Sequence, residues 1–241
     1  MKLFVLLVIF YVSSGNPKEI PSFLHVCNRN EPDLEKCIIK SVEDLRPILI
    51  EGVPEYNIPS IEPMIISDLL ADKLKDLVLN ITNVKAYGCS KFVVNSVKMN
   101  LETLDCNLDI DFPELRIEAD YNVDGKLLML NIHGKGLFQA NITDICSTSN
   151  LKGEFVEKDG DKYMHYNSVH TKAKFSGGVV KLENPSADKV LMQIMNDVAN
   201  KNLEMFAKEL MPGIQKALSD IFLNIGNDIV KDFTFDQLFP Q

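Results

Sequence analysis

The feature that most constrains the fold is a stripe of apolar residues at helical spacing near the carboxyl end of the chain. It begins after Asn184-Pro185-Ser186 and continues for about forty residues, which would make a helix ~60 Å long. The stripe consists of Leu191, Met195, Val198, Leu203, Phe206, Leu210, Ile214, Leu218, Ile221, Ile225 and Ile229. Further apolar residues lie beside it, so more than one face of the helix requires cover. We expect Pro212-Gly213 to kink it, because proline lacks a backbone donor and clashes with the preceding turn.

The middle of the chain, from about residue 77 to 183, changes to a hydrophobic period of two. Strict alternation is typical of strands with one dry and one solvated face. The alternating apolar residues are Leu104, Cys106, Leu108, Ile110 and Phe112, then Leu115, Ile117, Ala119, Tyr121 and Val123. Weaker strand patterns cover residues 77–87, 92–101, 126–133, 137–145, 151–156, 163–175 and 179–182. Asp124-Gly125 and Lys158-Asp159-Gly160-Asp161 predict hairpin turns.

A shorter helical pattern precedes this region, over residues 33–50. Asp33 is its expected N-cap, and Pro47 is expected to bend or end it. Three prolines between residues 54 and 63 predict an extended connector. Together the patterns predict an α+β fold in which a highly curved antiparallel sheet wraps the long C-terminal helix with its concave, dry face.

The first fifteen residues have the pattern of a secretory signal peptide. Met1-Lys2 is followed by ten apolar residues and then by Ser13-Ser14-Gly15, which suits cleavage after Gly15. A membrane anchor is the alternative, but ten residues give only ~15 Å of helix against a hydrocarbon core of ~30 Å. The sequence therefore predicts a signal peptide over residues 1–15, a secreted single domain over residues 16–241, and no integral membrane segment.

The five cysteines can be interpreted in the light of this predicted secretion, because an oxidising compartment permits disulfides. Cys27 and Cys37 lie close together in the sequence, so a bridge between them would attach the N-terminal segment to the first helix. The remaining Cys89, Cys106 and Cys146 cannot all pair. A bridge from Cys106 to Cys146 is one of three options, and a buried free thiol is an equally good interpretation for one of the three.

Other sequence features concern the surface and possible chemistry. Sequons at Asn80 and Asn141 permit N-glycosylation, and a formal net charge of −9 disfavours nucleic acid as a partner.

The sequence contains no motif of a serine hydrolase elbow, zinc protease, phosphate-binding loop or Cys-x-x-Cys site. Gly134-Lys135-Gly136 lacks the third glycine of a dinucleotide loop and is expected to be a tight strand connection. The four histidines lack metal-ligand spacing. We therefore expect no catalytic residue, no metal and no cofactor, and we predict that the protein is not an enzyme.

The chain is rich in adaptable apolar side chains, with nine methionines and thirteen phenylalanines. A curved sheet around one helix leaves room at its ends, so these residues indicate an apolar pocket as well as a core. The candidate ligand-binding residues are Leu108, Ile110, Phe112, Ile117, Ala119, Tyr121, Phe206, Leu210 and Ile214. Tyr121 is either a polar anchor for the ligand or a core tyrosine bonded to the backbone.

Several motifs resemble those of the insect takeout and juvenile-hormone-binding protein family. They are Asp33-Leu34-Glu35-Lys36-Cys37-Ile38 after Cys27, the segment 52–64, Leu79-Asn80-Ile81-Thr82-Asn83-Val84, Phe112-Pro113-Glu114-Leu115, the segment 121–128 and the segment 233–240. The resemblance covers nearly the whole predicted mature chain. It implies a secreted carrier with the architecture of BPI/TULIP-like lipid-transfer proteins, a hydrophobic ligand of terpenoid, fatty or quinone-like type, and a first disulfide between Cys27 and Cys37.

The chain departs from the hormone-binding members of this family in one respect. Those members have a second disulfide to the long helix, and no cysteine follows Cys146 here. The resemblance therefore favours the takeout branch, with roles in feeding, behaviour, chemosensation or circadian rhythm, over a specific juvenile-hormone carrier.

Two functional hypotheses follow from the sequence. The first is a monomeric extracellular carrier of a hydrophobic small molecule. The second is a protein-interaction or signalling factor whose helix fills the sheet completely and whose acidic surface docks on a protein receptor. A continuous internal void above ~100 Å³ would favour the first, since a drug-sized ligand needs several times that volume. An esterase is a third possibility, but no nucleophile and base stand at a suitable spacing.

Overall fold

The computed structural model describes residues 19–74, 77–127 and 130–241, so the predicted signal peptide lies outside the described residues. The helices are α1 (Leu34–Glu51), α2 (Lys189–Lys201), α3 (Leu203–Val230) and α4 (Phe235–Leu238), with 3₁₀ turns η1 (Pro54–Tyr56) and η2 (Cys89–Lys91). The strands are β1 (Met64–Leu74), β2 (Leu77–Tyr87), β3 (Val93–Met99), β4 (Cys106–Leu127), β5 (Leu130–Lys158), β6 (Asp161–Lys174) and β7 (Gly177–Glu183).

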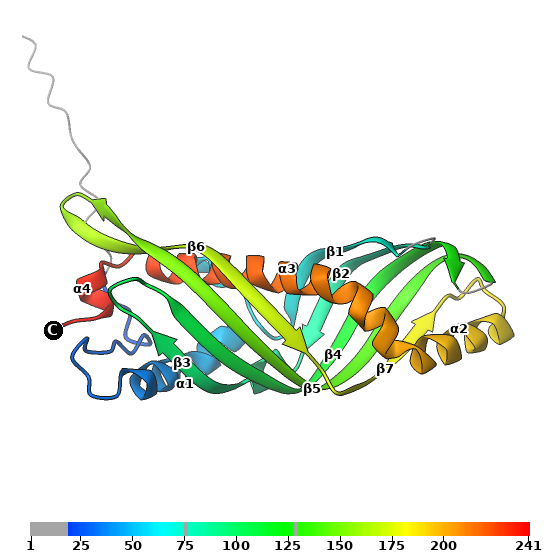
Figure 1. Cartoon of the computed structure of the whole chain (residues 1–241), viewed down its shortest axis with the longest axis horizontal. Helices are drawn as coiled ribbons and strands as arrows, with labels where there is room; N and C mark the ends of the chain where they lie inside the picture. The colour runs from blue at the N-terminus through cyan, green and yellow to red at the C-terminus, as the bar shows by residue number, and fades with distance from the viewer. Residues whose placement is uncertain (1–18, 75–76, 128–129) are drawn as a thin grey trace, which may run out of the picture.

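The strands form one antiparallel sheet in the order β1-β2-β4-β5-β6. Strand β3 pairs with β4 beside β2, and β7 pairs with β5 beside β6. The central strands β4 and β5, of 22 and 29 residues, are long enough to bend around the interior. Figure 1 shows the resulting curved sheet, which confirms the predicted architecture.

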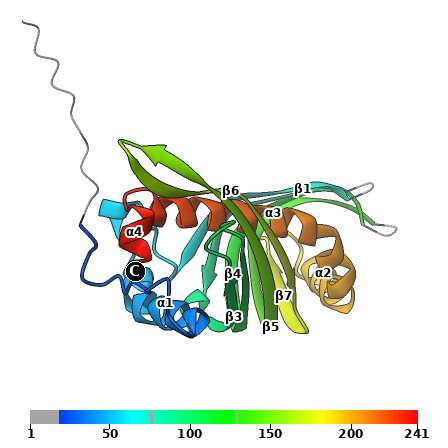
Figure 2. The same cartoon turned by 60° about the vertical axis from the view of Figure 1, so that its left-hand side comes forward.

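Helix α3 closes the open side of the sheet. It contacts β6 and β1, the two outer strands, while α2 packs against β7 (Figure 1). At the other end, α1 packs against β3, and α4 contacts β6 (Figure 2). These contacts confirm the prediction that a curved sheet wraps the C-terminal helix.

Among the described residues, no helix combines the length and hydropathy needed to span a membrane.

Helix α1 continues through Pro47 to Glu51, so this proline does not end the first helix. Helix α3 also continues through Pro212, and the predicted kink at Pro212-Gly213 stays a prediction. The C-terminal helical region breaks at Asn202. Both prolines lie on exposed helix faces, where water can bond the carbonyl group that loses its partner. At the real break, the amide of Asn202 donates to the Val198 carbonyl at 2.8 Å and ends α2.

The sheet also differs from the sequence prediction in where its strands end. Asp124 and Gly125 pair with His133 and Ile132 inside the ladder, so the predicted hairpin at Asp124-Gly125 is wrong. The weak patterns 137–145 and 151–156, with much of 126–133, merge into β5, which also contains Gly134-Lys135-Gly136. The Asp159-Gly160 turn is confirmed, because both residues have positive φ, as a two-residue hairpin requires.

Asparagine side chains of α2 occupy the free edge of β7. The Oδ1 atom of Asn200 accepts from the Val180 N–H at 2.9 Å, and its Nδ2 donates to the Val180 carbonyl at 2.8 Å. Asn196 makes the same pair of bonds with Leu182, at 2.7 and 3.0 Å. Each amide thereby replaces a neighbouring strand and satisfies a backbone edge that would otherwise be unpaired.

The edge of β6 is satisfied in the same way by α3. Asn227 accepts from the Tyr166 N–H at 2.8 Å and donates to the Tyr166 carbonyl at 2.9 Å. Ser219, which lies about two turns before Asn227 in α3, accepts from the Thr171 N–H at 2.9 Å. The helices are therefore hydrogen-bonded to the sheet as well as packed against it.

The five cysteines have a simple arrangement. A disulfide joins Cys27 to Cys37, with Cα atoms 5.9 Å apart, and this is the pairing expected from the sequence. The side chain of His25 lies near this pair, but bonded sulfurs cannot act as thiolate ligands of a metal. Cys89, Cys106 and Cys146 are free. The optional Cys106–Cys146 bridge is absent because Cys106 pairs with Leu151 and Cys146 with Asp111, which places the two thiols on opposite faces of the sheet.

The two sequons lie within strands. Asn80 is part of β2 and Asn141, whose side chain is exposed, is part of β5. Asn80 lies between Leu79 and Ile81, which face the interior, so alternation directs it to the outer face. Glycosylation at these sites stays a prediction.

Candidate ligand-binding cavity

An elongated cavity of about 310 Å³ lies between the concave face of the sheet and the inner faces of α2 and α3. Its volume is at the lower end of the range for small-molecule pockets. Along β4 the lining extends from Phe112 to Val123, which is ~35 Å of strand at about 3.3 Å per residue. The helical lining residues are Met195, Ala199, Leu203, Phe206, Ala207, Leu210, Met211, Ile214, Leu218 and Phe222. The cavity is therefore long and narrow, a shape that suits one extended chain.

The walls of the cavity are almost entirely apolar. Of the described lining residues, Lys174 alone is charged, and it is exposed. Ala173 faces the interior, so alternation directs the next side chain, Lys174, to the outer face. Ser147 donates its hydroxyl to the Ile110 carbonyl at 2.9 Å. Apart from the exposed Lys174, the described lining therefore offers no ionic group to a ligand.

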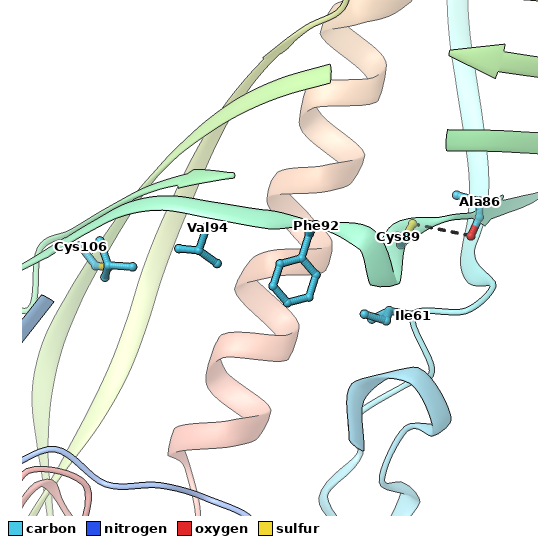
Figure 3. Packing of buried hydrophobic residues seen from close by; sticks show 7 residues of the cluster. Ile61, Ala86, Cys89, Phe92, Val94 and Cys106 are labelled. Atoms are coloured by element: carbon cyan, nitrogen blue, oxygen red, sulfur yellow. Dashed lines mark hydrogen bonds between the residues drawn. The ribbon is translucent and has the colours of Figure 1, made fainter. Parts of the chain in front are cut away.

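Cys89 closes the cavity at the end nearest α1. Its thiol donates to the Ala86 carbonyl at 3.6 Å, within a buried cluster that also contains Ile61, Phe92 and Val94 (Figure 3). Burial raises the pKa of this thiol to about 12, so it stays protonated and uncharged at neutral pH.

Tyr121 lies near the other end of the cavity, in a buried cluster with Val123 and Met195 of α2. It is 3% exposed, and burial raises the pKa of its phenol, which therefore remains a donor. It pairs with Gly136 of β5, where a Cβ atom would lie 1.9 Å from the Glu183 carbonyl oxygen and 3.1 Å from the Tyr121 ring. Gly136 thus makes room for both β7 and the tyrosine ring.

The residues predicted from the sequence fall into two groups. Phe112, Ile117, Tyr121, Phe206, Leu210 and Ile214 line the cavity. Leu108 and Ile110 do not, because that half of β4 packs against the cluster beneath α1 and β3. Ala119 is buried against Ile81 and Val84 and is also not part of the lining. These three residues therefore belong to the core part of the predicted set, and the ligand-binding role of the other six stays a prediction.

Sequence reasoning missed the contributions of β1, β2, β5, β6, β7 and α2. In β2 the inward residues Leu79 and Ile81 are followed by Val84, because Asn83 has a positive φ and the ladder shifts register beside it. The inward set of β5 shifts in the same way at Asp144, which also has a positive φ. A period-two count is valid only between such positions, so it could not be carried along a whole strand.

The free thiols give a testable prediction about the interior. Burial raises the pKa of Cys89 to about 12 and of Cys106 to about 11, so both have very little thiolate at about pH 8. Cys146 is only partly buried and pairs with Asp111 on the outer face. A hydrogen bond with Asp111 raises the pKa of its thiol, so accessibility is what distinguishes it from the other two. We expect iodoacetamide to label Cys146 in the native protein and the other two only after unfolding, as measured by peptide mass spectrometry. Rapid native labelling of Cys89 would contradict the described packing.

Comparison with known proteins places the chain in a family. The family model of haemolymph juvenile hormone binding protein matches residues 4–240. The chain belongs to this family. It is 27% identical over 232 residues to the circadian clock-controlled protein daywake of Drosophila yakuba, covering 91% of this chain and 88% of that protein. The daywake protein of Drosophila melanogaster is 26% identical over 234 residues, covering 92% and 88%.

A solved structure supports the fold. The crystal structure of Epiphyas postvittana Takeout 1 superposes with a TM-score of 0.78 at 16% identity, covering 90% of this chain and all of that chain. The family and the fold class predicted from the sequence are both confirmed.

Proposed function

We propose that this protein is a secreted, non-enzymatic carrier that binds a hydrophobic small molecule in the cavity between the sheet and α3. The observation that carries the proposal is the long, almost entirely apolar cavity of about 310 Å³. Its volume exceeds the ~100 Å³ that separates a binding cavity from a filled core, so it supports a carrier over a solid interaction factor.

The expected affinity follows from the area of ligand removed from water. At roughly 25 cal/mol per Å², sequestering ~300 Å² of apolar surface contributes roughly 7 kcal/mol before ordering costs. That free energy corresponds to binding on the micromolar scale. No strong polar recognition is required for a carrier of this kind.

The relatives support the ligand class in general terms. The matched family is named for binding juvenile hormone, and the daywake relatives are named for control by the circadian clock. The absence of any cysteine beyond Cys146 in this chain excludes a second disulfide to the long helix. We therefore propose a terpenoid, fatty or quinone-like ligand and a role like those of takeout proteins, with the chain acting as an extracellular monomer.

The test is to purify the protein from its natural fluid and to analyse organic extracts by mass spectrometry. We expect a co-purifying lipid, terpenoid or quinone, and uptake of the neutral fluorescent probe Nile red by the delipidated protein. A denatured sample of the same chain serves as the control for nonspecific adsorption. An empty extract together with no probe uptake would overturn the proposal.

A further inference from the structure

Helix α2 exposes large apolar side chains on a face that does not line the cavity. Val190 is 65% exposed, Leu191 45% and Ile194 44%. Spacings of three and four residues place them on one side of the helix, and we call this surface the α2 patch. Figure 1 shows α2 at the end of the molecule opposite α1 and α4. Apolar side chains gathered on one exposed helix face indicate a contact surface.

Another side of the same helix belongs to the cavity. Met195 and Ala199 line the cavity, and Met195 is buried. The side chains of Asn196 and Asn200 hold α2 to the backbone of β7 through the bonds described above. The α2 patch is therefore held outward, and only the thickness of one helix, about 10 Å, separates it from the cavity.

The charges around the α2 patch are balanced. Helix α2 and its N-cap carry two acidic and two basic side chains, which are Asp188, Asp197, Lys189 and Lys201. The whole chain, in contrast, has a formal net charge of −9. An electrically neutral lipid surface would therefore meet no repulsion at α2, whereas an anionic lipid surface would repel the rest of the chain. Lys201 lies seven residues after Ile194, on the same side of the helix, where its ammonium can reach lipid headgroups.

The size of the α2 patch also favours a lipid surface over a protein. A stable protein interface uses roughly 20–30 residues on each side, whereas the exposed apolar surface here covers little more than one turn of α2. A helix that lies in the lipid interface needs only one apolar face, which enters the boundary of headgroups and acyl chains by roughly 5–10 Å. Such a small contact is weak and reversible, as the exchange of a ligand requires.

We propose that the α2 patch docks reversibly on an electrically neutral lipid surface, and that a ligand passes between this surface and the cavity at the α2 end. The passage of ligand rests on the carrier function proposed above. An apolar molecule that crosses the solvent exposes its whole surface to water, whereas a docked α2 leaves it about one helix diameter to travel. Docking therefore speeds exchange without changing the affinity of the cavity.

The docking test compares the native chain with the double variant Val190→Gln, Ile194→Gln. Sedimentation with phosphatidylcholine vesicles should show at least about a tenfold lower partition of this patch variant, because two exposed apolar side chains no longer enter the lipid. Vesicles that contain phosphatidylglycerol should bind the native chain more weakly. The matched control is Val93→Gln, Val156→Gln, which replaces valines of β3 and β5 that are 48% and 42% exposed. The control should dock like the native chain.

Ligand exchange is measured by mixing protein loaded with Nile red with vesicles that carry an energy-transfer acceptor. The rate should rise in proportion to vesicle concentration for the native chain and the control, and it should fall in the patch variant by the same factor as the partition. Nile red affinity measured without vesicles should be equal in all three proteins.

The inference is overturned if the patch variant docks or exchanges like the native chain, if the exchange rate does not depend on vesicle concentration, or if vesicles with phosphatidylglycerol bind more tightly. A native dimer that the patch variant lacks would also overturn it, because the α2 patch would then be an interface between two copies. If the native chain takes up no Nile red without vesicles, the carrier function itself fails, whereas normal uptake without docking overturns only this inference.

Discussion

Replacing Ala207 with tryptophan is expected to weaken ligand binding by at least about tenfold without unfolding the protein. Ala207 is half-buried on the inner face of α3 and lines the cavity between Phe206 and Leu210. The added indole would enter the cavity, so it would occupy the space that a ligand needs. Because that space is empty of protein atoms, we expect a stability change below ~1.5 kcal/mol, unlike the overpacking of a filled core.

The measurement is titration with Nile red, combined with thermal unfolding of each variant. Lys208→Trp is the matched control, because Lys208 is the next residue of α3 and its side chain is exposed. The control should bind like the native protein. If Ala207→Trp does not fold, Ala199→Phe in α2 places a smaller ring in the same cavity. Native-like binding by a folded cavity variant would show that ligands bind elsewhere.

Replacing Asn227 with alanine is expected to lower the free energy of unfolding by about 2–4 kcal/mol. The amide of Asn227 bonds both the N–H and the carbonyl of Tyr166, at 2.8 and 2.9 Å. Alanine would leave two part-buried backbone groups at the edge of β6 without partners, and each such group costs ~1–3 kcal/mol. The effect should be largest on the attachment of α3 to the sheet.

Urea unfolding measures this effect, with Asn224→Ala as the control. Asn224 is exposed on the same helix, so its replacement should change stability by less than about 0.5 kcal/mol. Hydrogen exchange at the Tyr166 amide should also become faster in Asn227→Ala. Equal stability of the two variants would show that the helix is held by apolar packing alone.

The sequence predicted the cavity walls where a single period continued without interruption. On α3, the inward residues Phe206, Leu210 and Ile214 follow one helical stripe, and all three line the cavity. On β4, Ile117 and Tyr121 follow one alternating run and also line it. These positions were accessible because their periodicity is a local property of a regular helix or strand.

The prediction failed where non-local contacts decide the environment. Leu108 and Ile110 have the same alternation as Phe112, but they pack against the buried cluster that α1 covers, where β3 pairs with β4. The dipeptide Asp124-Gly125 has a strong turn preference, yet pairing with β5 keeps it in the strand. Similarly, Pro47 does not end α1, because its exposed position leaves the affected carbonyl group to water.

The sequence by itself determined the kinds of elements, their order and the need for a sheet to cover the apolar C-terminal helix, because hydrophobic periodicity is encoded residue by residue. Only the tertiary structure decided how the helices are bonded to the edges of β6 and β7, and which part of β4 faces a cavity. The physical reason is that partnership and empty space depend on atoms brought together from distant segments. The cavity is bounded by residues from Met64 to Phe222, so no local pattern can specify it.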